Sequence, residues 1–598
     1  MNKLRSREQG LRTRAQIGAV TAVLAAGALT VPGSLAAHAA VTAPIDCPDA
    51  FPTADAVDGV TGTGFTVERG TTPQPFSATV LGRVTDGIAP GVDMILADLS
   101  SPAITRAGGV WAGMSGSPVY TQDGRLIGSV SYGLAASSPI AGITPASEMF
   151  KLLDLDAAQA RAAAAKLKDK VAVGKAAAQR LARTGDVTTA EAQAGFSRLR
   201  LPVTVSGAGS GHNGKEFERL RRTLPDAVIT TGSAAPGTAA APSEISAGSN
   251  FAATWSYGTA TIGGVGTTTF VCDGQAVAFG HPAFFTGADA TETAHPATAV
   301  VVQPDPLFGP FKVANIGGIA GTIDQDRLAG LRAHLGQQPA TAPITTNLRV
   351  DGGPVQTLKT QATAQPFMAD VTFSHMIAAV DRGLDKIGPG SADVILRVRG
   401  VRADGSAFTV SRGDKISDTS DISYLLAVHA ADFVYSLTSQ DFEDIRITSV
   451  TMGGALSSKA SDYRVSAFKV RSAGKYIPVP NPINVREGGV LTTQFTLRPY
   501  RGGGALKTVD IPVAVPRGSG NGFGSLDVAA GQDYPASEPS SFAALLTQLR
   551  STPGPDSLRV TMRVTNVNTG RTVTTRVTTK ADRAVVPWEN SYEVSSTP

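Results

Sequence analysis

The sequence predicts a mostly β protein that is divided into several domains. The chain has 598 residues, which is more than one hydrophobic core normally supports. It is rich in glycine and proline, with 65 and 37 copies, and only 17% of its residues are charged. Short β-branched runs bounded by glycine or proline recur along its length. These features are typical of an extracellular β-rich protein.

Residues 1–40 have the pattern of a secretory signal peptide. A basic start is followed by an apolar run at residues 17–31 and by the small residues of Ala37-His38-Ala39. An uncleaved membrane anchor is the alternative, but Pro32-Gly33 interrupts the apolar run, and no other segment is apolar enough to span a bilayer. The pattern therefore predicts cleavage and a secreted protein that has no membrane contact afterwards.

The formal net charge of +4 belongs to this leader. Five basic residues and one acidic residue lie within it, so the chain that remains has a net charge of zero. That balance gives no support to nucleic-acid binding or to an anionic membrane surface as a partner. Oligomeric state is left open by the sequence.

Five regions follow the leader. Residues 155–249 stand apart because Ala162–Ala165 and the spacing of Lys and Arg favour helix, and because Ser233–Ser249 has the composition of a flexible loop or linker. The expected regions are a first β unit at 41–154, a helical connector and linker at 155–249, a second β unit at 250–345, an α+β module at 346–460 and a β-sandwich-like module at 461–598.

Cys47 and Cys272 are the only cysteines. In an exported protein such a pair can close one disulfide, although two buried free thiols are the alternative. Neither cysteine has a second ligand at metal-binding spacing, so we expect no metal site, and nothing in the sequence indicates a cofactor.

The segment Gly113-Met114-Ser115-Gly116-Ser117-Pro118 carries the clearest chemical signal. A serine flanked by glycines can occupy a tight turn whose backbone N–H groups point into one space. Such groups can hold the oxyanion that forms when a serine attacks a carbonyl, an effect of about 2.7–4 kcal/mol per donor. Ser131-Tyr132-Gly133 follows, after an Asp123-Gly124 turn, where an edge strand could present itself to a peptide. We expect Ser115 to be the nucleophile. Residues that we expect to bind the oxyanion or the substrate are Gly113, Ser131 and Gly133. The alternative is a glycine- and serine-rich loop without catalytic chemistry.

These motifs resemble the sporulation factor IV B family of serine peptidases, which has a Gly-Met-Ser-Gly-Ser-Pro nucleophile loop. The similarity covers most of residues 60–150 and a second stretch at residues 263–281, which ends in Ala278-Phe279-Gly280-His281. The resemblance implies a two-barrel, chymotrypsin-like fold in which Ser115 attacks and His281 accepts its proton. The family places its His-bearing half first, so the order here implies a permuted pair of barrels.

His281 is favoured as the base because histidine titrates near neutrality and because the other histidines have less suitable settings. His295, which precedes Pro296, is its main rival. The remaining ones are His38 in the leader, His212 in a polar loop, and His334, His375 and His429 on expected helices.

The third member of a triad is less defined. Asp98 lies near the family's acidic position, whereas Asp324 and Asp326 follow His281 at a plausible separation or cap an expected helix at Arg327–His334. Asp98 is the first choice, and a Ser-His dyad is also possible.

The sequence therefore predicts a secreted serine endopeptidase that acts on a protein or peptide substrate and can process its own chain. The alternative is a non-catalytic relative that binds a protein or cell-wall partner.

Overall fold

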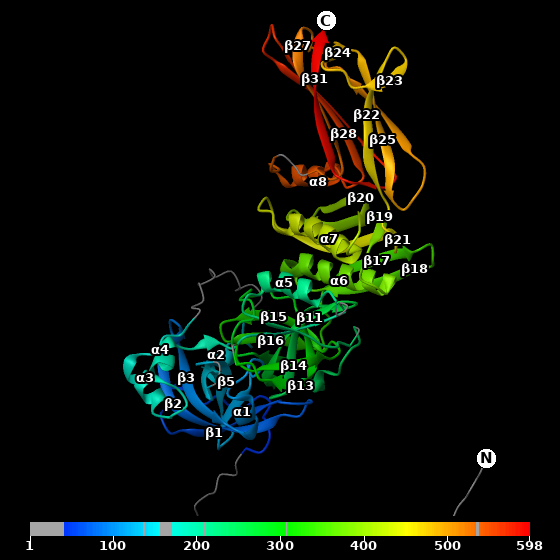
Figure 1. Cartoon of the computed structure of the whole chain (residues 1–598). Helices are drawn as coiled ribbons and strands as arrows, with labels where there is room; N and C mark the ends of the chain where they lie inside the picture. The colour runs from blue at the N-terminus through cyan, green and yellow to red at the C-terminus, as the bar shows by residue number, and fades with distance from the viewer. Residues whose placement is uncertain are drawn as a thin grey trace, which may run out of the picture. The chain divides into compact units, whose positions relative to one another are not determined.

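A computed structural model describes residues 41–135, 138–155, 170–207, 211–235, 237–306, 308–533 and 537–598. The chain is mostly β, with 48% strand and 17% helix, so the predicted fold class is confirmed. The expected signal peptide and Ala162–Ala165 lie outside the described residues. Figure 1 shows the order of the elements along the chain.

The first β unit is a closed barrel of six antiparallel strands. The strands pair in the order β1-β2-β3-β6-β5-β4, and the pairing of β4 with β1 closes the ring. Their bounds are β1 (Thr61–Thr66), β2 (Gln74–Ala89), β3 (Val92–Ser100), β4 (Pro118–Thr121), β5 (Leu126–Gly133) and β6 (Ile140–Pro145). Short helices surround them: α1 (Pro102–Ala107), α2 (Ala146–Phe150), α3 (Lys175–Ala182) and α4 (Thr189–Ala194).

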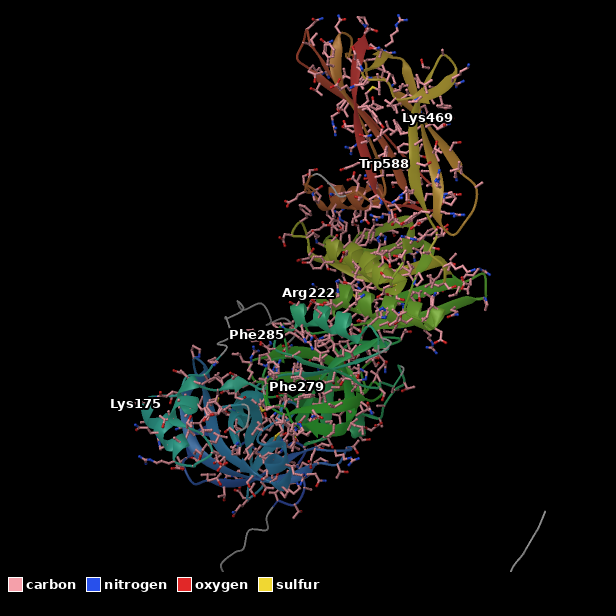
Figure 2. The ribbon with its side chains drawn as sticks, viewed as in Figure 1. Lys175, Arg222, Phe279, Phe285, Lys469 and Trp588 are labelled. Carbon is pink, nitrogen blue, oxygen red and sulfur yellow. A yellow bond between two sulfur atoms is a disulfide. The ribbon has the colours of Figure 1, made fainter. Side chains whose placement is uncertain are left out.

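A second closed barrel uses the same strand order. Its strands pair as β10-β11-β12-β16-β15-β13, and β13 returns to β10. Their bounds are β10 (Asn250–Gly258), β11 (Thr261–Cys272), β12 (Gln275–Ala278), β13 (Thr293–Gln303), β15 (Gly321–Arg327) and β16 (Gly330–Leu335). Phe279, which is labelled in Figure 2, belongs to the hydrophobic core of this barrel. Its ring packs edge to face against Phe251, with the ring centroids 5.9 Å apart. The helix expected at Arg327–His334 is wrong, because these residues form a hairpin whose strand β16 pairs with β12.

The connector contributes strands to both barrels. β7 (Ser197–Arg198) joins the edge of the first barrel, and β8 (Pro202–Ser206) pairs with β11 of the second, followed by α5 (Asn213–Thr223) and β9 (Val228–Thr231). The stretch Ser233–Ser249 is not a free linker, since its backbone bonds to the second barrel, for example from Ala240 N to Ile319 O at 2.8 Å. β14 (Phe311–Ile316) pairs with β13.

The sheet of the second barrel continues into the α+β module through β18 (Val355–Ala362), which pairs with β10. Side chains of strand β19 (Gly390–Arg402) in this module alternate between buried and solvent-facing positions, because one face of the sheet packs on two helices. Those helices are α6 (Met368–Leu384) and α7 (Ile422–Thr438), which lie side by side in Figure 1. The strand bounds are β17 (Ala342–Val350), β18 (Val355–Ala362), β19 (Gly390–Arg402), β20 (Ala407–Asp418) and β21 (Ile445–Ser457).

The C-terminal module is a β-sandwich of two five-stranded sheets that share one hydrophobic core. One sheet contains β22 (Asp462–Ser472), β23 (Lys475–Pro478), β25 (Val490–Arg501), β26 (Lys507–Ala514) and β30 (Ala584–Val585). The other contains β24 (Ile483–Arg486), β27 (Gly522–Ala530), β28 (Ser557–Asn566), β29 (Thr572–Lys580) and β31 (Trp588–Thr597). Helix α8 (Phe542–Ser551) packs against the α+β module through Phe408 and Phe542.

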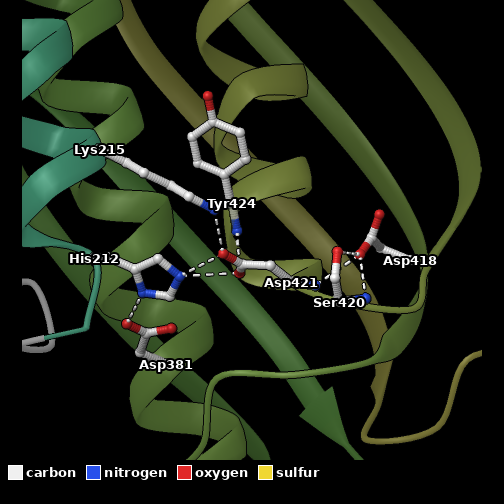
Figure 3. A network of polar contacts seen from close by, with 7 residues as sticks. All are labelled: His212, Lys215, Asp381, Asp418, Ser420, Asp421 and Tyr424. Atoms are coloured by element: carbon white, nitrogen blue, oxygen red, sulfur yellow. Dashed lines mark hydrogen bonds and ion pairs between the residues drawn. The ribbon is translucent and has the colours of Figure 1, made fainter.

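His212 lies in the turn that precedes α5, and its side chain is buried. Its Nδ1 lies 2.7 Å from Asp381 on α6, and its Nε2 lies 2.9 Å from Asp421, the N-cap of α7 (Figure 3). The hydrogen bond to Asp381, reinforced by Asp421, raises the pKa of His212. Lys215 of α5 also bonds to Asp421, so this cluster fastens α5 to both helices of the α+β module.

Candidate active site

Ser115 lies in the loop between α1 and β4, where the backbone is held from both barrels. Gly116 N donates to Val130 O of β5, and Ser115 O accepts from Thr267 N of β11, each at 2.8 Å. Gly116 has a φ of 94°, and a Cβ there would lie 1.9 Å from Thr267 O. Only glycine fits this turn, because a side chain would collide with the second barrel.

His281 is presented by a sharp turn that follows β12. Phe279 and Gly280 both have positive φ, at 70° and 67°, which reverses the chain and turns the imidazole toward the first barrel. A Cβ at Gly280 would lie 2.2 Å from the hydroxyls of Ser129 and Ser131. Thr144 of β6 donates to Gly280 O at 2.6 Å, which fixes the turn against the first barrel.

The two side chains meet across the barrels. Ser115 Oγ lies 2.8 Å from His281 Nε2, and His281 Nδ1 lies 2.8 Å from Pro282 O. A carbonyl oxygen only accepts, so Nδ1 must carry the proton and Nε2 of the neutral ring is free to accept from the Ser115 hydroxyl. Burial lowers the pKa of His281 to about 4, with a further contribution from the charge of Arg198. The ring is therefore neutral at pH 7 and is held in the tautomer of a general base.

Asp98 does not lie among the hydrogen-bond partners of His281 in the described chain. It sits on β3 opposite Thr79, and burial raises its pKa, helped by the nearby charge of Asp186. The proposed third member therefore has no contact that would orient the imidazole, and the carbonyl of Pro282 holds Nδ1 instead. This geometry corresponds to a Ser-His dyad.

The two other aspartates considered from the sequence have different surroundings. Asp324 bonds to Arg332 and His334. Asp326 accepts the backbone N–H groups of Ala283 and Phe284, at 3.0 and 2.7 Å. Asp326 thus fastens the loop that begins at His281 and carries the Pro282 carbonyl.

The backbone around Ser115 offers two unused donors. In the described residues the N–H groups of Met114, Gly116 and Ser117 all have acceptors, whereas those of Gly113 and Ser115 have none. Gly113 O accepts from the hydroxyl of Thr267 at 3.0 Å. Backbone N–H groups without an acceptor beside Ser115 are the kind of donor that can stabilise an oxyanion.

Ser131 and Gly133 lie on the edge of β5, but the chain itself covers that edge. β7 pairs with it in antiparallel register, with Tyr132 opposite Arg198 and Gly133 opposite Ser197. The ring of Tyr132 lies 6.5 Å from that of His281, so this edge borders the dyad. Sequence reasoning missed β7, because two paired residues have no periodicity that could be recognised.

Lys312 is a second feature that the sequence did not indicate. It is fully buried beneath the nucleophile loop, where a Cβ on Gly113 would lie 2.8 Å from Lys312 Cβ. Its Nζ donates to Asn250 Oδ1 at 2.8 Å, and burial lowers its pKa to about 7. The only signal for its burial was the alternation of Phe311–Ile316 between the two faces of a strand, which places Lys312 on the buried face.

The rival histidine, His295, has a structural role on β13. Its Nε2 bonds to Thr254 Oγ1 at 2.9 Å and its Nδ1 to Gly317 O at 3.1 Å. No serine or cysteine lies among its hydrogen-bond partners in the described residues. His375 lies on α6 and His429 on α7, as expected, whereas His334 lies on β16.

Cys47 and Cys272 are joined by a disulfide with their Cα atoms 4.7 Å apart. Within the described ranges, no cluster of three or more His, Cys, Asp or Glu side chains could hold a metal ion. No helix in those ranges is both long and apolar enough for a membrane span.

Comparison with known proteins gives no relative: no protein-family model, curated protein or solved structure matches the chain. The assignment of function therefore depends on the geometry of the site.

Proposed function

We propose that the protein is a secreted serine endopeptidase in which Ser115 is the nucleophile and His281 is its general base. The observation that carries the proposal is the contact between Ser115 Oγ and His281 Nε2 at 2.8 Å, together with the proton that Pro282 O holds on Nδ1. The motif resemblance to the sporulation factor IV B peptidases supports the same assignment, and secretion is proposed from the leader at residues 1–40.

The geometry suggests how the residues act in sequence. His281 Nε2 takes the hydroxyl proton as Ser115 Oγ attacks a peptide carbonyl, and the free N–H groups of Gly113 and Ser115 stabilise the oxyanion. The imidazolium that forms then gives its proton to the leaving amine. Water, activated by the same ring, hydrolyses the acyl-serine ester and restores both side chains.

The chain offers closely matched control variants for a test. Ser115→Ala and His281→Gln should each abolish peptide-bond cleavage, and the double variant should be no worse, because the pair acts as one unit. Ser117→Ala makes the same chemical change two residues away in the same loop and should retain activity. His334→Gln serves the same purpose for the histidine.

Two measurements suffice: reaction of each variant with a fluorophosphonate probe, and cleavage of an unfolded protein substrate. Labelling that persists in Ser115→Ala would contradict the proposed nucleophile. Absence of both labelling and cleavage in the unaltered chain would favour the alternative, a non-catalytic protein that binds a protein or cell-wall partner.

A further inference from the structure

A segment of the chain itself lies along the edge strand beside the dyad. Ser197 and Arg198 pair antiparallel with Gly133 and Tyr132, and Leu199 N donates to Ser131 O at 3.0 Å. Three consecutive residues therefore form an extended strand on β5. An extended peptide bound to a sheet edge through its main chain is a common way in which proteins hold peptides.

The register places Leu199 on β5 close to the strand residue that binds the Ser115 loop. Leu199 faces Ser131, whose hydroxyl lies against Gly280, and the neighbouring Val130 O accepts from Gly116 N of the Ser115 loop. A cavity of about 570 Å³ is lined both by the segment 197–201 and by His281 with the loop after it. Leu199 and His281 therefore line the same cavity.

The side chain of Leu199 occupies an apolar site. It packs against the hydrophobic core of the first barrel, and a Cβ on Gly133 would lie 3.1 Å from Leu199 Cδ2. The glycine leaves room for a branched side chain here. Any side chain in place of Gly133 would narrow this site. With glycine there, the site accepts an aliphatic side chain of the size of Leu199.

The backbone of Leu199 and that of the Ser115 loop have complementary groups without hydrogen-bond partners among the described residues. The carbonyl oxygen of Leu199 accepts no hydrogen bond from the described residues, and the N–H groups of Gly113 and Ser115 donate none. Beyond Leu199, the side chain of Arg200 donates to the carbonyls of Asp226 and Ala227, which lie between α5 and β9. Both Leu199 and Arg200 are thus held in place by hydrogen bonds.

We infer that the site takes extended peptides with a leucine-like residue before the cleaved bond, and that Leu199–Arg200 in this chain is its first substrate. The inference rests on the proposed function. Ser115 Oγ forms an ester with the Leu199 carbonyl carbon, and the bond to Arg200 N breaks. The hydroxyl proton passes through His281 to the departing amine. Water then hydrolyses the ester, which gives a Leu199 carboxylate and regenerates the serine.

Cleavage would also open the edge strand, because a new end at Leu199 can leave β5 and admit another peptide. The disulfide between Cys47 and Cys272 spans the cut site, so the two products would stay covalently joined. They would separate only after reduction.

The test uses the full chain and its Ser115→Ala variant, resolved on gels with and without reductant and followed by N-terminal sequencing. The unaltered chain should give two fragments after reduction, the larger beginning at Arg200, and one band without reductant. Ser115→Ala should remain whole. A quenched fluorescent peptide with the sequence of residues 194–204 should be cut at the same bond.

Two substitutions of Leu199 test the apolar site. Leu199→Asp should slow the internal cut by at least about 100-fold, because a carboxylate would replace the apolar side chain that packs on the core of the first barrel. Leu199→Met has similar volume and should stay within about tenfold of the unaltered rate.

The outcomes separate the two ideas. Fluorophosphonate labelling of Ser115 with cleavage of an unfolded protein, but with no cut at Leu199–Arg200 in chain or peptide, overturns the inference and leaves the proposed function. If the unaltered chain shows no labelling and no cleavage, both the inference and the proposed function are overturned. Cleavage at this bond in Ser115→Ala would assign it to another peptidase and overturn the inference.

Discussion

The ionisation of His281 gives a quantitative test of the dyad. Burial lowers the pKa of its imidazole to about 4 from an ordinary value of 6.5. At pH 5 about nine-tenths of the rings should be neutral, compared with about 3% for a solvated histidine. The reaction of Ser115 with a fluorophosphonate needs the neutral ring, so its rate at pH 5 should stay close to the rate at pH 7.

The same shift affects stability, with a definite sign. The unfolded chain binds a proton near pH 6.5, whereas the folded chain resists it until about pH 4. The free energy of unfolding therefore has its full value above pH 6.5 and decreases as the pH falls toward 4. The decrease that His281 causes is at most about 3 kcal/mol. Chemical denaturation of Ser115→Ala with and without His281→Gln, at pH 7 and pH 4.5, would measure this difference.

Nuclear magnetic resonance of ring-labelled histidine reads the pKa directly, without relying on activity. The His281 signal is assigned as the one missing from His281→Gln, and Ser115→Ala keeps the chain whole during the titration. A midpoint near pH 6.5 in the intact chain would refute the reasoning, because it would mean that the ring is hydrated and that the barrels do not enclose it.

Three further predictions concern the surroundings of the dyad. Asp326→Asn leaves one of two backbone N–H groups without an acceptor, so kcat should fall about 5- to 150-fold with little change in KM; a change in KM alone would contradict this positioning role. Burial lowers the pKa of Lys312 to about 7, so between pH 7 and pH 10 the unfolded chain binds a proton that the folded chain does not. The stability of the unaltered chain relative to Lys312→Met should therefore increase over this range. Equal changes in the melting temperatures of the two proteins from pH 7 to pH 10 would disprove the prediction. Cys47→Ala removes the disulfide and frees a loop whose ends are 225 residues apart. The chain-entropy relation predicts that the free energy of unfolding falls by about 5 kcal/mol. An unchanged free energy of unfolding in urea would show that the bridge has no stabilising role.

The proposed pair, Ser115 and His281, could be recognised in the sequence because its signals are local. Ser115 lies between Gly113, which closely approaches Lys312, and Gly116, which closely approaches Thr267. His281 follows a strand and a glycine that reverse the chain. Asp98 was a poor choice as third member because sequence position does not reveal which way a strand residue faces. The partner of Nδ1 is a backbone carbonyl, a group that every residue carries, so no residue type marks it.

Pairing between distant segments explains the other differences. The residues Arg327–His334 have good helix formers, but their hydrogen bonds to β12 outweigh that intrinsic preference. The Ser233–Ser249 stretch looked like a linker from composition, yet its backbone groups find acceptors on the second barrel. Such pairings join residues that are far apart in the chain, for example Val277 with Arg332 and Ala240 with Ile319, and a local pattern cannot show them.

The division of the dyad between two barrels also has a consequence for timing during synthesis. The nucleophile and its base are 166 residues apart in the chain, and the nucleophile is made first. At about 5–20 residues per second, roughly 10–30 s pass between the two. Throughout that interval the chain contains Ser115 without His281, so the proposed dyad cannot act before the second barrel has been made and has folded.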